Sequence, residues 1–119
     1  MDAVRLLIVD DEPPLLELLR RYLERMGYEV DTATGPHEAL AKYQAQPERY
    51  DLVVTDLSLD EINGEQLLER MRALNPSVRG LITSGYPHQP QLAGVGFLQK
   101  PFLPKMLAEA VEKAIRSKR

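Results

Sequence analysis

Four short apolar runs, each followed at once by polar residues, constrain the fold of this 119-residue chain more than any other feature. The runs occupy residues 6–9, 52–54, 80–82 and 96–99. Runs this short, bounded by turn signals, are typical of buried strands rather than helices. If the strands are parallel, the polar residues that follow them gather at one edge of the sheet, where open α/β sheets hold their ligands. Those residues are Asp10, Asp11, Asp56, Thr83, Ser84 and Lys100.

Helical periodicity fills the intervals between the runs. Strands are predicted at 5–9, 28–33, 52–54, 78–83 and 95–99, and helices at 13–26, 36–46, 64–74 and 103–116. Residues 85–96 contain two prolines and three glycines, so any helix there has one or two turns at most. Strands that alternate with helices through short loops predict an α/β fold with a parallel sheet and helices on both faces.

The composition fits one compact, soluble domain over residues 1–119. There is no cysteine, which excludes disulfides and thiolate metal sites. No apolar run approaches the roughly 20 residues that cross a bilayer, so we expect a cytoplasmic protein that binds no membrane. Residues 1–64 carry 14 acids and 6 bases, whereas residues 65–119 carry 4 acids and 9 bases. No dense basic run appears, and nucleic-acid binding by this domain is therefore not expected.

Two groups of residues are assigned structural roles. The leucine-rich stripe of the first helix, which includes Leu18 and ends at Met26, is expected in the core. His37 and His88 have no metal-ligand companion at helical spacing, so both are expected at the surface.

The polar residues at the strand ends suit phosphoryl chemistry. Clustered carboxylates repel one another, so the site is expected to hold a proton or a hard cation. Oxygen ligands favour Mg²⁺, with Mn²⁺ possible, and magnesium commonly combines carboxylates, waters and a phosphoryl group. A carboxylate can itself be the nucleophile, and Asp56 is the candidate because it stands alone at its strand end.

Each residue also has a simpler explanation. Asp10 and Asp11 could only cap a helix, and Asp56 could belong to a turn. Thr83 and Ser84 could be loop hydroxyls, Lys100 a solvated lysine and Phe97 a core residue. These separate explanations do not account for the fact that the acidic pair, Asp56, the hydroxyl pair and Lys100 all occupy equivalent positions at the ends of predicted strands.

The chain resembles the receiver domain of two-component response regulators (CheY-like) over essentially its whole length. The resemblance is carried by four motifs, which are Val9-Asp10-Asp11-Glu12, Thr55-Asp56-Leu57-Ser58-Leu59 with Asn63-Gly64 downstream, Ile82-Thr83-Ser84-Gly85-Tyr86, and Phe97-Leu98-Gln99-Lys100-Pro101-Phe102. It implies a flavodoxin-like five-stranded sheet in the order 2-1-3-4-5. It also implies a cis peptide bond between Lys100 and Pro101.

The resemblance implies a role for each matching residue. Asp56 would accept phosphate from a phosphohistidine of a sensor histidine kinase or histidine phosphotransfer protein. Asp11, Asp56 and the backbone carbonyl of Ser58 would bind the metal, with Asp10 helping through a water molecule, and Lys100 would pair with the phosphoryl group.

A switch would follow phosphorylation. Ser84, or Thr83 if a bulge displaces the strand, would swing towards the phosphoryl group, and Phe97 would change its packing. A downstream protein whose identity the sequence does not reveal would then read the switch.

The chain departs from the family pattern in two places. Asp60 stands where the family usually has proline, and the interval from Ser84 to Lys100 is short. The second departure implies a fourth helix that is truncated or missing, and thus a monomer or weak dimer.

Three other functions remain open. They are a magnesium phosphohydrolase with an aspartyl nucleophile, a degenerate receiver that signals without phosphorylation, and a nucleotide or flavin binder. A nucleotide or flavin binder requires a glycine-rich loop after the first strand, whereas the acidic residues found there would repel phosphate.

Overall fold

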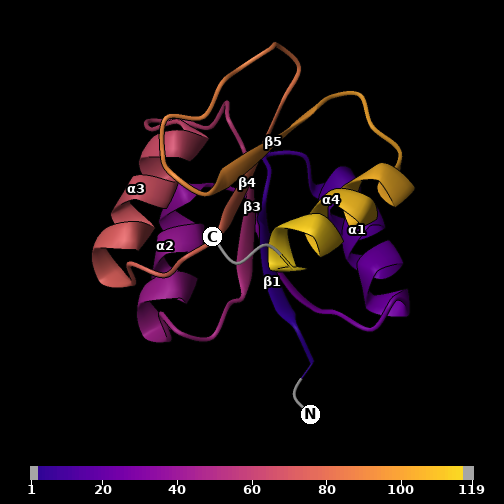
Figure 1. The fold of residues 1–119 in the computed structure, drawn as a ribbon, viewed down its shortest axis with the longest axis horizontal. Coiled ribbons are helices and arrows are strands. Elements are labelled where there is room, and N and C mark those ends of the chain that lie inside the picture. The colour runs from indigo at the N-terminus through magenta and orange to yellow at the C-terminus, as the bar shows by residue number, and fades with distance from the viewer. Residues whose placement is uncertain (1–2, 117–119) are drawn as a thin grey trace.

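The computed structural model describes residues 3–116, so residues 1, 2 and 117–119 of the predicted domain lie outside the described part. Five parallel strands form a single sheet in the order β2-β1-β3-β4-β5 (Figure 1). The strands are β1 (Arg5–Val9), β2 (Glu29–Ala33), β3 (Leu52–Asp56), β4 (Gly80–Ser84) and β5 (Val95–Gln99). The predicted flavodoxin-like, doubly wound α/β fold is confirmed.

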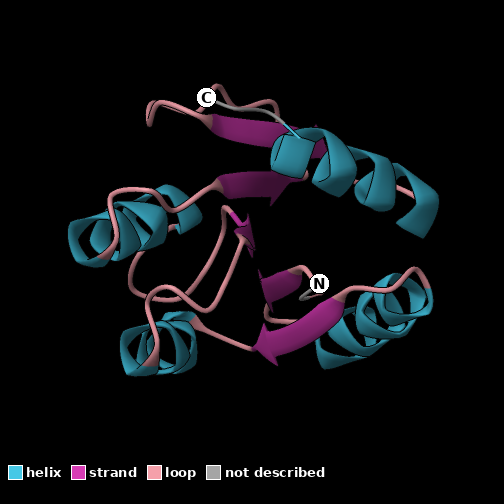
Figure 2. Ribbon diagram, turned by 60° about the horizontal axis from the view of Figure 1, so that its bottom comes forward, coloured by secondary structure: helices cyan, strands magenta, loops and turns pink. Residues whose placement is uncertain are grey.

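Four helices cover the sheet. They are α1 (Pro13–Arg25), α2 (Pro36–Ala45), α3 (Gly64–Leu74) and α4 (Pro104–Arg116). The helices α1 and α4 cover one face of the sheet, and α2 and α3 cover the other (Figure 2). Residues 85–94 contain bends and a turn but no helix, which confirms that the fourth helix of the family is missing.

Alternation of side chains along the strands builds two cores. Leu6 and Ile8 of β1 pack with the leucines of α1 and α4, whereas Leu7 and Val9 pack against α2 and α3. Successive side chains of a strand point to opposite faces of the sheet, so a strand covered on both faces is apolar throughout. The strands β1, β3 and β4 occupy the middle of the sheet, and their carboxyl ends reach the same edge.

The structure departs most from the sequence predictions at the start of β4 and on the surface of α1, and other element bounds differ by one or two residues. β4 begins at Gly80 rather than Val78, because the N–H of Val78 bonds to the carbonyl of Asn75 in the turn after α3. Leu18 and Met26 are about half exposed, at 53% and 55%, whereas Leu16, Leu19 and Leu23 are buried. Leu18 lies two residues beyond Leu16, and residues two apart do not share a helix face.

Among the described residues, no helix combines the length and apolar composition that a bilayer crossing requires.

Candidate functional site

The carboxyl edge of the sheet brings an ammonium group between two carboxylates. Asp10 follows β1, Asp56 is the last residue of β3, and Lys100 follows β5. The Lys100 Nζ donates to Asp10 Oδ2 at 2.9 Å and to Asp56 Oδ2 at 3.3 Å. The side chain of Lys100 is only 23% exposed, and Asp10 and Asp56 are buried. The lysine therefore neutralises part of a buried negative charge, and it is not the solvated surface residue of the simpler explanation.

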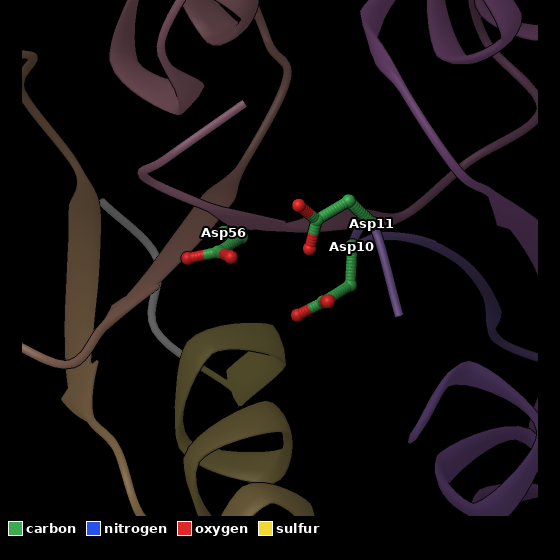
Figure 3. A group of neighbouring side chains, drawn as sticks. All are labelled: Asp10, Asp11 and Asp56. Carbon is green, nitrogen blue, oxygen red and sulfur yellow. The ribbon is translucent and has the colours of Figure 1, made fainter. Parts of the chain in front are cut away.

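Asp11 completes a cluster of three carboxylates (Figure 3). One oxygen atom from each of Asp10, Asp11 and Asp56 lies within 4.8 Å of the others. The three side chains come from two strand ends and converge on one space, while Asp11 itself stays exposed. An all-oxygen donor set that is open to solvent fits a hard, partly hydrated cation such as Mg²⁺.

Helix capping does not explain the acidic pair at residues 10 and 11. The N-cap residue of α1 is Glu12, whose side chain makes no capping hydrogen bond. Asp10 Oδ1 instead accepts the backbone N–H of Glu12 at 3.0 Å, and its other oxygen receives Lys100. Asp10 is thus oriented by two donors.

The surroundings shift two pKa values in the same direction for different reasons. Burial raises the pKa of Asp56, and the neighbouring Asp10 raises it further, against the opposing effect of Lys100. Burial lowers the pKa of Lys100, but its hydrogen bonds and charge attraction to Asp10 and Asp56 outweigh burial and raise it. The lysine therefore stays protonated at neutral pH, whereas burial disfavours the ionised form of Asp56.

The remaining predicted site residues lie around this cluster. Ser58 donates its N–H towards Asp56 Oδ1 at 3.5 Å, and the role of its carbonyl stays a prediction. Thr83 and Ser84 are both buried, and β4 pairs with β3 and β5 in continuous register, with no bulge that would exchange them. Ser84 Oγ accepts the N–H of Tyr86 at 3.0 Å.

The backbone of β4 also positions the lysine. Lys100 N donates to the Ser84 carbonyl at 2.7 Å, so the lysine is held where β5 ends. The bond between Lys100 and Pro101 is cis, as predicted. Phe97 is half-buried on β5 opposite Ile82.

Two features of the site were not found from the sequence. Gly64 was predicted as the first residue of a helix, but its closeness to Asp56 was not: an added Cβ on Gly64 would lie 2.3 Å from the Asp56 carbonyl oxygen. His88, expected at the surface, has a side chain only 24% exposed and pairs with Glu65 at 2.7 Å. His37 is exposed, as expected.

Comparison with known proteins decides the family. A family model described as the response regulator receiver domain matches residues 6–112. The chain belongs to the response regulator receiver domain family. Receiver domains are phosphorylatable signalling domains rather than classical enzymes, and the geometry above is that of an acidic pocket with one lysine.

Several curated relatives of this receiver domain are longer proteins. It is 34% identical to the transcriptional regulatory protein GlrR of Escherichia coli over 116 residues, which cover 92% of the chain and 26% of GlrR. It is 36% identical to the alginate biosynthesis transcriptional regulatory protein AlgB of Pseudomonas aeruginosa over 117 residues, covering 93% of the chain and 26% of AlgB. The chain thus spans about a quarter of the length of these regulators.

Solved structures share the fold of the receiver domain. The receiver domain of the hybrid histidine kinase CckA superposes with a TM-score of 0.84 and 33% identity, covering 94% of this chain and 99% of that one. The response regulator TrrA of Thermotoga maritima, solved in complex with Mg(2+)-BeF, gives a TM-score of 0.80 at 33% identity, with 93% and 98% coverage.

Proposed function

We propose that this receiver domain is a magnesium-dependent phosphoacceptor switch that is phosphorylated on Asp56. The donor is a phosphohistidine of a sensor histidine kinase or a histidine phosphotransfer protein. The observation that carries the proposal is the position of Lys100 Nζ, which lies within hydrogen-bonding distance of two members of the three-carboxylate cluster, Asp10 and Asp56.

In the transfer, a carboxylate oxygen of Asp56 attacks phosphorus and forms a P–O bond. The P–N bond of the donor breaks, and the electron pair returns to the imidazole ring of the histidine. The Lys100 ammonium already lies beside the Asp56 carboxylate, so it can pair with an oxygen of the phosphoryl group without a large movement. Preorganised cations of this kind stabilise the charge spread over a transferring phosphoryl group.

Asp10, Asp11 and Asp56, with the backbone carbonyl of Ser58, would hold Mg²⁺, or Mn²⁺ in its place. A bound divalent cation would neutralise phosphoryl oxygens that the clustered carboxylates would otherwise repel. The likeness to TrrA, which was solved with Mg(2+)-BeF, supports this metal assignment.

Phosphorylation would be read through the end of β4. Ser84 is the proposed switch hydroxyl, because β4 is free of a bulge and Ser84 lies one residue beyond Thr83, the register partner of Asp56. When its hydroxyl turns towards the phosphoryl group, its hydrogen bond with Tyr86 N–H is lost and the following loop is released. Phe97, half-buried on the neighbouring strand, is the aromatic residue that would repack.

Intact-mass spectrometry after incubation with acetyl phosphate, with and without magnesium, tests the proposal. We expect one phosphate adduct that requires magnesium and is absent from Asp56→Asn. Asp60→Asn is the matched control, because Asp60 is an exposed aspartate in the loop that follows Asp56, and it should be labelled normally. Binding of beryllium fluoride to a folded protein that shows no adduct would indicate a phosphoryl group lost within the experiment.

Failure of both reagents would contradict the phosphoacceptor assignment and favour a receiver that signals without phosphorylation. Catalytic turnover of a phosphomonoester would instead indicate the phosphohydrolase. We further propose that the domain works in the cytoplasm as a monomer or weak dimer and passes its state to a downstream protein.

A further inference from the structure

The two edges of the sheet differ in how they are protected. β2 and β5 are the outermost strands. β2 carries Glu29 and Asp31, and the Lys42 ammonium donates to the carbonyl of Thr32. β5 has the sequence Val-Gly-Phe-Leu-Gln and no charged residue. Charged side chains on an edge strand discourage pairing with a strand of another chain. β2 has such charges and β5 has none.

The hydrogen bonds between β4 and β5 show which backbone groups of β5 face away from the sheet. Lys100 N donates to Ser84 O across the β4–β5 pair. Backbone groups of a strand point alternately to the two sides, so the N–H and C=O groups of Gly96 and Leu98 face β4. Those of Val95, Phe97 and Gln99 therefore face outward. No hydrogen bond from another described residue reaches these three outward-facing residues.

The missing fourth helix leaves one face of β5 without a helical cover. α4 lies beside the sheet on one face, whereas α3 on the other face reaches only as far as β3 and β4, and a loop lies beside β5 (Figure 2). Strand β5 accordingly has intermediate or exposed residues throughout.

A groove of about 1000 Å³ adjoins this strand. Its lining includes Val95 and Phe97 together with three cations, Arg72, Arg79 and Lys113, and no carboxylate. Arg72 and Arg79 donate to backbone carbonyls, and Arg72 Nε is buried without a hydrogen-bond partner. Among the described residues, none of the three cations forms an ion pair with a carboxylate.

We propose that β5 and this basic groove, beyond any phosphoacceptor role of Asp56, bind an extended acidic segment of a partner protein by strand addition. An added strand would satisfy the outward backbone groups of Val95, Phe97 and Gln99, and its carboxylates would meet the groove cations. Main-chain pairing of this kind supplies affinity, and side-chain pockets supply specificity. A second copy of the chain fits less well, because a twofold axis would bring the same basic half of the sequence to both sides.

Hydrogen exchange of the unphosphorylated chain tests the backbone geometry. The free protein should show rapid exchange at Val95, Phe97 and Gln99 and slow exchange at Gly96 and Leu98. The probes are fluorescein-labelled eight-residue peptides in which glutamate alternates with valine or threonine. NMR measures amide exchange in the protein, and fluorescence anisotropy measures the affinity for the peptide. Binding should protect the three fast amides and leave the alternate pair unchanged.

Charge variants test the groove. Lys113→Glu should weaken peptide binding by about threefold to tenfold, the range for converting one exposed attractive pair into a repulsive one. Lys105→Glu is the matched control, because Lys105 is also an exposed lysine of α4 but does not line the groove. The Lys105→Glu protein should bind the peptide as tightly as the unmodified chain.

Several outcomes would overturn the proposal. The first is failure of every acidic peptide to protect the β5 amides. Peptides with lysine in place of glutamate could bind equally well, or Lys113→Glu and Lys105→Glu could lose affinity equally. Either result would contradict recognition of acidic side chains by the groove cations. Protection that instead rises with protein concentration alone, together with dimers in sedimentation, would assign the edge to a second copy of the chain. None of these readouts requires phosphorylation, so they stand apart from the test of Asp56.

Discussion

Replacing Gly64 with alanine tests whether the start of α3 holds the phosphoacceptor strand in place. The Cβ of Gly64→Ala would lie 2.3 Å from the Asp56 carbonyl oxygen and 3.0 Å from Thr55 Cγ2, whereas ordinary contact begins at 3.4 Å. The oxygen belongs to the backbone, so no side-chain rotation can relieve the clash. The start of α3 and the end of β3 must separate by about 1 Å.

The expected cost follows from that separation. Overpacking of a close contact typically costs about 1–3 kcal/mol. The hydrogen bond from Gly64 N to the Leu57 carbonyl, now 2.8 Å long, would be weakened as well. The net value of such a bond is about 0.5–1.5 kcal/mol. Alanine is the better helix former by roughly 0.5–1 kcal/mol in a helix interior, but Gly64 is the first residue of α3, so this gain offsets only a small part of the loss. We therefore expect the free energy of unfolding to fall by about 1–3 kcal/mol.

The same shift should reach the chemistry, because the displaced carbonyl belongs to Asp56 itself. A misplacement of about 1 Å can cost roughly a hundredfold in rate, so labelling of Gly64→Ala by acetyl phosphate should slow by about tenfold to a hundredfold. Urea unfolding gives the stability, and the time course of the mass adduct gives the rate. The rate is compared under conditions in which both proteins are fully folded.

Gly85→Ala is the control for Gly64→Ala, because an added Cβ on Gly85 meets no atom within 4 Å. Gly85 also lies near the site, directly after the predicted switch residue Ser84. Its stability should change by no more than about 0.5 kcal/mol. If Gly64→Ala matched the unmodified chain in stability and labelling rate, the close approach of α3 to Asp56 would have no energetic importance and the reasoning would be refuted.

Two further substitutions probe the charges of the molecule. Because burial and Asp10 raise the pKa of Asp56, its protonated form stabilises the fold at low pH, and that contribution is lost as the pH rises through the raised pKa. Without magnesium, Asp56→Asn should therefore be more stable than the unmodified chain at pH 7, with the difference vanishing near pH 4. Urea unfolding across this range checks it, and a constant difference would contradict it. Glu65→Gln should speed amide exchange at Leu92, because the Glu65 carboxylate accepts that N–H at 2.8 Å and pairs with His88. Glu69→Gln, an exposed neutralisation on the same helix, should leave the exchange unchanged.

The fold was predictable because periodicity and local signals agree along most of the chain. β3 is buried at every position and begins with the apolar run 52–54, and α3 begins at Gly64 after Asn63, which forms a capping box with Gln66. The start of β4 was less predictable. The turn after α3 takes the N–H of Val78, and no hydropathy pattern reveals that hydrogen bond.

The candidate site was predictable to the extent that it depends on strand ends. A parallel sheet brings the carboxyl ends of its strands together, so Asp10, Asp56 and Lys100 could be placed near one another from their positions alone. Their distances, burial and hydrogen bonds could not, because these depend on how closely helices and strands approach. The closeness of Gly64 to Asp56 is of this second kind.

The loop that replaces the missing helix shows why the remaining contacts escape sequence reasoning. Glu65 accepts hydrogen bonds from the backbone of Gln91 and Leu92 and pairs with His88, all more than 20 residues further along the chain. The carboxylate compensates for backbone donors that no helix satisfies in this loop. Glu65 directly follows Gly64, whose backbone abuts Asp56, so α3 contacts the phosphoacceptor strand and holds the loop through adjacent residues. The start of α3 therefore connects the end of β3 with residues 88–92 through contacts that do not involve Ser84.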